Sequence, residues 1–178
     1  MNKLIVIDWS IFVHRAIFSY RYNRQIPVEY TALNMILSCL IKIGLDTSDK
    51  VIVACDGRGN WRKDYEAQYK ANRKEYRESF DDIDWNDMWS KFNVLLEKVN
   101  ESTNWYVIKI DKIEADDIAS VCSRYFKDRE IILVSYDKDW ELLWEYDNVK
   151  IFSQLLKFNG LKGAYKVKPS NFNAYKLL

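Results

Sequence analysis

Histidine is the scarcest chemically versatile residue in this chain of 178 residues, with a single copy at His14. One histidine excludes most catalytic triads and most zinc-hydrolase sites, because these need at least one well-placed imidazole and often several. Glycine is also rare, with five residues, and neither glycine-rich phosphate-loop pattern (GxxxxGK[ST] or GxGxxG) occurs. Any chemistry in this chain therefore has to rest on other side chains.

The three cysteines, Cys39, Cys55 and Cys122, are far apart and form no CxxC pair. An odd count with this spacing argues against a disulfide framework and against a zinc site, so we interpret them as free, buried thiols in a reducing compartment. No apolar run approaches the length of a membrane span, and the N-terminus lacks the pattern of a signal peptide. We therefore expect a cytoplasmic protein without a membrane partner.

Neither sign of charge dominates, since 27 Lys and Arg residues against 26 Asp and Glu residues leave a net charge of +1. Charge is therefore informative only where it gathers locally. The length suits one domain that buries a substantial core, and we assign residues 1–178 to a single domain.

Short β-branched runs alternate with helical patterns along the chain. Strands are predicted at 3–8, 50–55, 105–110, 131–135 and 149–153. Helices are predicted at 10–20 (with Ser10 as the N-cap), 28–43 and 115–126. Asn159-Gly160 predicts a hairpin turn, and Pro169 the start of a short terminal helix. This alternation predicts an α/β fold with a mainly parallel central sheet and helices on both faces.

Carboxylates follow the predicted strands. Asp8 and Asp56 directly end two apolar runs, and Asp137 and Asp139 follow a third. Because chemistry collects at the carboxyl ends of strands in an open α/β sheet, we expect these side chains to meet at one edge. They could not all stay ionised there without a cation. The pattern predicts a divalent-metal site with oxygen ligands, suited to Mg²⁺ or Mn²⁺.

Three more carboxylates, Glu114, Asp116 and Asp117, lie within one turn at the start of a predicted helix. Each carboxylate alone has a simpler explanation, because Asp commonly caps a helix or complements its dipole. Their combination favours a metal cage, since mutual repulsion makes adjacent carboxylates a poor cap. An oxygen-only site suits phosphodiester chemistry, in which two ions about 3.5–4 Å apart activate a water and stabilise the leaving oxygen.

Cations and aromatic residues gather within a single stretch of about twenty residues. They are Arg58, Arg62, Lys63, Lys70, Arg73, Lys74 and Arg77, interleaved with Trp61, Tyr65, Tyr69 and Tyr76. A solvated helix with ordinary ion pairs would explain this pattern. A surface that follows a phosphate backbone, with a tyrosine as a stacking platform, would explain it as well. The acidic site favours the second interpretation, because a phosphodiester needs a cationic approach to a negative pocket.

Five segments together resemble the N-terminal catalytic domain of 5′ nucleases, the superfamily of flap endonucleases and 5′–3′ exonucleases. They are Ile7-Asp8 with His14-Arg15-Ala16, Cys55-Asp56-Gly57, Tyr69-Lys70-Ala71-Asn72-Arg73, Glu114-Ala115-Asp116-Asp117 and Ser135-Tyr136-Asp137-Lys138-Asp139. The likeness is greatest to phage members and to bacterial polymerase I 5′-nuclease domains. It implies a PIN-like fold with a helical arch over about residues 74–92, and hydrolysis of DNA near 5′ ends or branch points.

The resemblance also implies roles for single residues. Asp8, Asp56, Glu114 and Asp116 match the ligands of a first metal ion, and Asp117, Asp137 and Asp139 those of a second. Lys70 and Arg73 match catalytic cations at the scissile phosphate, Tyr69 an aromatic that stacks on the terminal base, and Arg15 a phosphate contact. Arg62, Lys74 and Arg77 of the basic stretch complete the expected nucleic-acid-binding set.

The implied two-metal reaction leaves a 5′-phosphate and a 3′-hydroxyl. Its expected substrates are 5′ flaps and single-stranded 5′ ends of DNA, with RNA in RNA–DNA hybrids as a further candidate. A phage-encoded member would act in the host cytoplasm.

The family pattern continues past the last residues of this sequence. A Gly-Asp-x-x-Asp segment completes the family's second metal site and leads into a helix–three-turn–helix that grips duplex DNA. Lys168-Pro169-Ser170 resemble the approach to that segment, which is absent. A truncated chain, a degenerate nuclease and a natural half completed by a second polypeptide would each explain this. A nucleic-acid-binding module without catalysis and a PIN-type ribonuclease also stay open, although the arch-like stretch argues against the latter.

Overall fold

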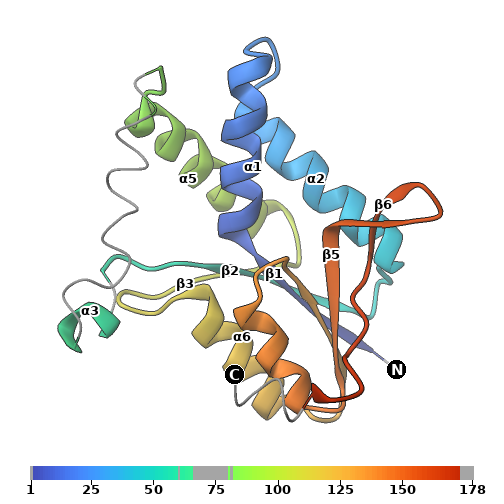
Figure 1. Ribbon diagram of the computed structural model, residues 1–178. Helices are drawn as coiled ribbons and strands as arrows, with labels where there is room; N and C mark the ends of the chain where they lie inside the picture. The colour runs from blue at the N-terminus through green and yellow to red at the C-terminus, as the bar shows by residue number, and fades with distance from the viewer. Residues whose placement is uncertain (1, 60, 66–79, 81, 173–178) are drawn as a thin grey trace.

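The computed structural model describes residues 2–59, 61–65, 80 and 82–172, without the side chains of residues 63 and 64. A sheet runs through the centre of the molecule with helices above and below it (Figure 1). The strands are β1 (Lys3–Asp8), β2 (Lys50–Cys55), β3 (Tyr106–Lys109), β4 (Glu130–Val134), β5 (Val149–Phe158) and β6 (Leu161–Tyr165). The helices are α1 (Trp9–Tyr22), α2 (Val28–Ile43), α3 (Trp61–Tyr65), α5 (Trp85–Ser102), α6 (Ala115–Tyr125) and the 3₁₀ helix η1 (Asp139–Glu145).

The sheet has the strand order β3-β2-β1-β4-β5-β6. The first five strands are parallel, and β6 pairs antiparallel with β5 through the turn at Asn159-Gly160. Both turn residues have positive φ angles, of 49° and 81°, as a tight hairpin requires. The predicted α/β class, the mainly parallel sheet and the hairpin are confirmed. The chain moves outward from β1 in one direction to β2 and β3, then returns to add β4 and β5 on the other side.

Alternation along the strands divides the core into two layers. Ile5 and Ile7 of β1 pack under α1, α2 and α5 on one face. Leu4 and Val6 of the same strand point to the other face, where α6 and η1 cover the sheet. Burial of both faces explains why the central strands read as continuous apolar runs rather than alternating ones. In the described part of the chain, no helix combines the length and the apolar character needed to cross a membrane.

The start of α1 differs from the prediction. Ser10 was expected as the N-cap, but the N-cap position is Asp8, so that β1 passes directly into the helix. The hydroxyl of Ser10 instead donates to Asp8 Oδ1 over 2.8 Å. The predicted α2 is confirmed from Val28 to Ile43, and its C-cap Gly44 has the left-handed φ of +73° that ends a helix.

The region expected to form an arch is described only in part. Residues 74–79 and 81 lie outside the described residues. From Trp85 the expected range belongs to α5, where Met88 and Phe92 are buried in the core. Asp84 caps this helix by accepting from the N–H groups of Asn86 and Asp87. The residues from Trp85 to Phe92, expected in the arch, therefore belong to a helix that packs against the core.

Gly57 lets the turn after β2 approach the loop that precedes α6. Its N–H donates to the carbonyl oxygen of Ile113 over 2.8 Å. A Cβ atom on Gly57 would lie 1.8 Å from the carbonyl oxygen of Ile110, which is backbone and has no freedom to rotate away. The contact holds Asp56, the residue before Gly57, next to the start of α6. Glycine is therefore required at position 57, because there is no room for a Cβ atom.

Replacing Gly57 with alanine should lower the free energy of unfolding by about 3 kcal/mol or more, because the backbone of one loop has to move. Gly59→Ala is the matched control: Gly59 has a φ of +72°, but its Cβ would meet only Lys112 Cγ at 3.9 Å. It should cost only about 1 kcal/mol of backbone strain. Urea denaturation measures both. Equal losses in the two variants would contradict the role given to close approach.

Candidate functional site

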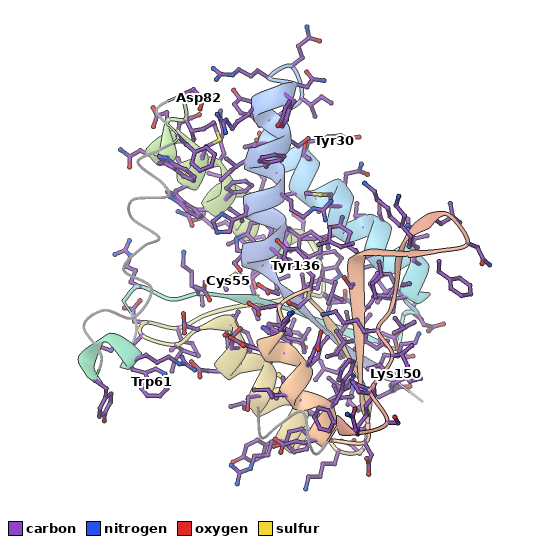
Figure 2. The ribbon with its side chains drawn as sticks, in the orientation of Figure 1. Tyr30, Cys55, Trp61, Asp82, Tyr136 and Lys150 are labelled. Atoms are coloured by element: carbon purple, nitrogen blue, oxygen red, sulfur yellow. The ribbon has the colours of Figure 1, made fainter. Side chains whose placement is uncertain are left out.

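The carboxyl ends of β2, β1 and β4 lie side by side, and each carries or leads to a predicted carboxylate. Asp8 ends β1, Asp56 follows β2, and Asp137 follows β4 after two residues. Figure 2 labels Cys55, at the end of β2, and Tyr136, just after β4, near the start of α1. The chain leaves β1 and β4 toward opposite sides of the sheet, which makes this the topological switch point where open α/β sheets bind ligands.

Asp8 is the buried centre of this edge, with an exposed fraction of 3%. Its carboxylate accepts hydrogen bonds from Ser10 Oγ at 2.8 Å and Ser135 Oγ at 3.0 Å. Burial, together with the charges of Asp116 and Asp56, raises the pKa of Asp8 to about 6 against the effect of the two hydroxyl hydrogen bonds. The strand ends therefore do bring Asp8, Asp56 and Asp116 into one electrostatic neighbourhood, as predicted.

Ser135 joins Asp8 to the loop after β4, a role that the sequence interpretation missed. Its fully buried hydroxyl donates to Asp8 Oδ2 and accepts from the N–H of Asp137 at 3.0 Å. The only signal in the sequence was its place directly after an apolar run. Asp137 and Asp139 are exposed, and Asp137 Oδ1 accepts from the N–H of Asp139 at 3.0 Å, which closes a tight turn before η1.

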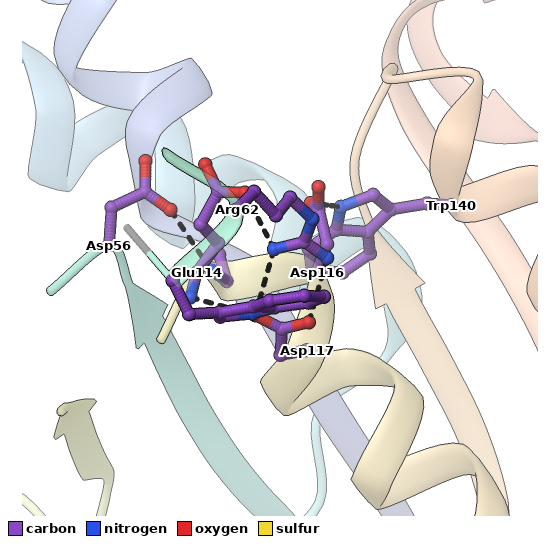
Figure 3. A network of polar contacts seen from close by, with 8 residues as sticks. Asp56, Arg62, Glu114, Asp116, Asp117 and Trp140 are labelled. Carbon is purple, nitrogen blue, oxygen red and sulfur yellow. Dashed lines mark hydrogen bonds and ion pairs between the residues drawn. The ribbon is translucent and has the colours of Figure 1, made fainter. Parts of the chain in front are cut away.

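The acidic start of α6 is held by Arg62 of α3 (Figure 3). Its guanidinium makes two hydrogen bonds to Asp117, at 2.8 and 3.1 Å, and one to Glu114 Oε2 at 2.8 Å. The guanidinium also stacks on the ring of Trp61 at 4.6 Å. Burial works to raise the pKa of Asp117, but the bonds from Arg62 and from the Glu114 N–H outweigh it and hold that pKa below its usual value. Arg62, predicted to bind nucleic acid, here contacts carboxylates.

Part of the simpler explanation of these carboxylates is correct. Asp117 Oδ2 accepts from the N–H of Glu114 at 3.0 Å, which is the reach-back contact of a helix cap. Asp56 Oδ1 accepts from the N–H of Ala115 at 2.9 Å and so joins the end of β2 to the first turn of α6. These carboxylates can therefore cap α6 despite their mutual repulsion, because the positive charge of Arg62 compensates their negative charges.

Asp116 has a donor that the sequence interpretation did not foresee. The indole Nε1 of Trp140, in η1, donates to Asp116 Oδ1 at 2.6 Å. Trp140 is almost completely buried, at 1% exposure, so this hydrogen bond is made inside the protein. Its position one residue after Asp139 was visible in the sequence, but nothing there indicated which carboxylate its N–H would reach.

The chemistry of these donors suits a divalent cation. They are oxygens without histidine, and the charges of Asp116 and Asp56 add to the burial that raises the pKa of Asp8, so a cation would relieve this repulsion. Over residues 2–59, 61–65, 80 and 82–172, however, no three Asp, Glu, His or Cys side chains stand close enough to hold one ion. Glu114 and Asp117 hydrogen-bond to Arg62, so ion binding by these two carboxylates requires Arg62 to release them.

The expected nucleic-acid contacts are described only in part. Lys70, Arg73, Tyr69, Lys74 and Arg77 lie outside the described residues, and their roles stay predictions. Arg15 lies on α1, and its charge lowers the pKa of Tyr136 against the dominant effect of burial, which places the guanidinium near the acidic edge. Within the described chain its buried Nη1 atom has no hydrogen-bond partner.

The raised pKa of Asp8 predicts an unusual pH dependence of metal-free stability. Between pH 4 and 6 the folded state keeps a proton on Asp8 that the unfolded state has released, so stability falls as pH rises, by up to about 3 kcal/mol. Asp8→Asn should remove this loss. The difference in unfolding free energy between variant and unchanged protein should grow over this window and stay constant above it.

Denaturation at pH 4 to 8 with a chelator present measures this difference. Asp46→Asn is the control of opposite sign, because the N–H of Ser48 holds the pKa of the exposed Asp46 below its usual value. The stability that Asp46 contributes is lost as pH falls. If the difference in unfolding free energy between Asp8→Asn and the unchanged protein does not vary with pH, the pKa of Asp8 is not raised.

Two curated proteins are similar in sequence to this chain. Ribonuclease H of Enterobacteria phage T4 is 31% identical over 162 residues, which cover 86% of this chain and 53% of the relative. A 5′-3′ exonuclease of Mycoplasmopsis pulmonis is 26% identical over 142 residues, which cover 78% of this chain and 44% of the relative. The chain thus spans about half the length of the curated relatives that it matches.

Solved structures with the same fold come from phage T5. A T5 5′-exonuclease with divalent zinc ions has a TM-score of 0.62 at 23% identity, covering 92% of this chain and 58% of that one. A T5 flap endonuclease in a complex with DNA and metal ions also has a TM-score of 0.62 at 23% identity, covering 85% and 55%. At this identity the likeness shows the fold.

A family profile covers nearly the whole chain. The profile described as the 5′-3′ exonuclease N-terminal, resolvase-like domain matches residues 3–171, which include all the predicted metal ligands. The resemblance drawn from the five sequence segments is confirmed. The chain belongs to the family of 5′-3′ exonuclease N-terminal, resolvase-like domains.

Proposed function

We propose that this chain is the catalytic domain of a divalent-metal-dependent 5′ nuclease, which hydrolyses phosphodiesters near 5′ ends or branch points of DNA. The observation that carries the proposal is the buried Asp8, whose pKa is raised by burial and by the neighbouring charges of Asp116 and Asp56. Such a site lowers its own energy by taking up a cation. The relatives named as nucleases, and the family to which the chain belongs, support the same reaction.

Mg²⁺ or Mn²⁺ would be the resident ion, with two ions expected. Asp8, Asp56, Glu114 and Asp116 would hold the first, and Asp117, Asp137 and Asp139 would contribute to the second. When bound, the ions would supply a nucleophilic water and charge stabilisation at the leaving oxygen. The carboxylates would hold the ions, and the buried hydroxyl of Ser135 joins Asp8 to the turn that carries Asp137.

Nucleic acid would approach across the basic stretch. Lys70 and Arg73 would contact the scissile phosphate, and Tyr69 would stack on the terminal base. Lys74 and Arg77 would extend this surface along the backbone, and Arg15 would add a phosphate contact from α1. Arg62 would join them only after releasing Glu114 and Asp117. Figure 3 shows how closely it is now engaged with both.

The phage T4 relative is named ribonuclease H, and this favours RNA in RNA–DNA hybrids as a second substrate. DNA and hybrid substrates with the same 5′ flap, compared at equal concentrations, would decide between them. We also propose that the full activity involves a helix–three-turn–helix beyond the residues present, whether in the same chain or in a second polypeptide. The setting would be the cytoplasm, that of the host for a phage protein.

Asp137→Asn tests the proposed chemistry. Cleavage of a labelled 5′-flap DNA in Mg²⁺ should fall by at least about a hundredfold, because that factor corresponds to only about 3 kcal/mol of transition-state stabilisation. DNA binding should be largely retained, since Asp137 would act on the metal. Asp147→Asn, an exposed aspartate at the opposite end of the sheet, is the matched control. Unchanged turnover by the purified Asp137 variant would refute the two-metal assignment.

Arg62→Ala tests whether Arg62 neutralises the same carboxylates that a bound metal ion would neutralise. Without metal, the variant should lose about 1–3 kcal/mol of stability, because two largely buried carboxylates lose their partner. With Mg²⁺ the loss should be smaller, since the ion replaces the missing charge.

Arg21→Ala breaks the more exposed pair with Asp82 and serves as the control. It should cost less than about 1 kcal/mol, and equally with and without the ion. If Mg²⁺ does not reduce the loss in Arg62→Ala, then Glu114 and Asp117 are not metal ligands. Thermal or urea unfolding with chelator and with Mg²⁺ gives both values.

A further inference from the structure

Trp140 links the two acidic parts of the proposed site from inside the core. It lies in η1, directly after the turn that carries Asp137 and Asp139, and its indole N–H donates to Asp116 on α6 at 2.6 Å. Figure 3 shows the ring reaching across from η1 to this carboxylate. The hydrogen bond therefore connects two segments on the same face of the sheet, one before and one after β4 in the chain, that are separated by more than twenty residues.

The geometry of this hydrogen bond suits a role for Trp140 in fixing the orientation of Asp116. An indole N–H is a donor only, and a buried one has to find an acceptor. Trp140 is 1% exposed and belongs to the same core cluster as Ala115 and Ala119 of α6, so its ring is locked by packing. One oxygen of Asp116 is thereby fixed. The charge of this carboxylate also acts on Asp8 at the end of β1.

We propose that Trp140 is a positioning residue for the metal site: its indole N–H orients the Asp116 carboxylate for ligation and couples it to the turn that carries Asp137 and Asp139. This inference rests on the proposed function, because Asp116 has to be a metal ligand. Hydrogen bonds that orient metal-binding carboxylates are commonly worth about 10- to 100-fold in metal affinity or activity. A purely structural tryptophan would contribute to stability alone.

Trp140→Phe removes the N–H and keeps an aromatic ring in the core. Trp144→Phe is the matched control, since Trp144 lies in the same helix and the same cluster, is 4% exposed, and packs edge-on against Phe172. A second variant carries β-(3-benzothienyl)alanine at position 140, which replaces the N–H by sulfur and preserves the shape of the ring. It keeps the test valid if Trp140→Phe does not fold.

Metal affinity is measured directly, by the fraction of Mn²⁺ that stays free in solution, and separately by the Mg²⁺ concentration that gives half-maximal cleavage. Both should shift about tenfold toward weaker binding in the two Trp140 variants, and neither should shift in Trp144→Phe. In the unchanged protein, the ¹⁵N–¹H resonance of the Trp140 indole should move on Mg²⁺ addition with the same midpoint. The resonance is assigned by its loss in Trp140→Phe.

Unchanged metal affinity in both Trp140 variants would overturn the inference, whether or not the protein cleaves DNA. Weakened Mn²⁺ binding in the Trp140 variants would support the inference even if the protein cleaves nothing. Absence of any Mn²⁺ binding by the unchanged protein would overturn both. Equal weakening in Trp140→Phe and Trp144→Phe would assign the effect to core packing and would also overturn it.

Discussion

The burial of one carboxylate, Asp8, at the carboxyl end of the central strand is the constraint on which this edge of the molecule depends. A charge taken out of water is costly unless hydrogen bonds or an opposite charge compensate it. Two serine hydroxyls, from Ser10 and Ser135, compensate in part. The pKa of Asp8 stays raised at about 6, because burial and the neighbouring Asp116 and Asp56 outweigh them. The hydrogen bonds therefore compensate the buried charge only in part.

The rest of the fold serves to bring other groups to Asp8. The strand order places the ends of β2 and β4 on either side of β1. Gly57 allows the turn after β2 to lie against the loop before α6, and Asp56 then accepts from the first turn of that helix. Arg62 neutralises the outer carboxylates of α6, while Trp140 holds the inner one. Each contact joins segments that are distant in the chain, so the site is a property of the whole sheet.

Most of the fold follows from the sequence because its signals are local. The runs before Asp8 and Asp56 are buried on both faces, and the helical period from Val28 to Ile43 ends at a left-handed glycine. The predicted cap at Ser10 was wrong, because β1 passes directly into α1 and Asp8 takes the N-cap position. The 3₁₀ helix η1 carries no recognisable period and could not be predicted from pattern alone.

The sequence predicted that carboxylates gather at this edge, and Asp56 and Asp116 do act on Asp8 there. Their roles as metal ligands stay predictions, and their hydrogen-bond partners were not predictable. Aspartates at strand ends can be recognised in the sequence, because a carboxylate directly after a buried apolar run is unusual without a capping or binding role. Which partner each one meets depends on side chains from other elements, such as Ser135, Arg62 and Trp140, and no local pattern encodes those pairings. Arg62 shows the consequence: its place in a basic stretch suggested a nucleic-acid contact, whereas the fold turns it toward Glu114 and Asp117.

The central claim is that these strand-end carboxylates bind divalent ions. Anomalous diffraction from crystals soaked in Mn²⁺ tests it most directly, because it locates the ion without reference to activity. The account predicts an anomalous peak at the edge between Asp8, Asp56 and Asp116, with carboxylate oxygens at about 2.0–2.2 Å, and its loss in Asp8→Asn. Peaks only at other surfaces, or a peak at this edge that persists in Asp8→Asn, would contradict it.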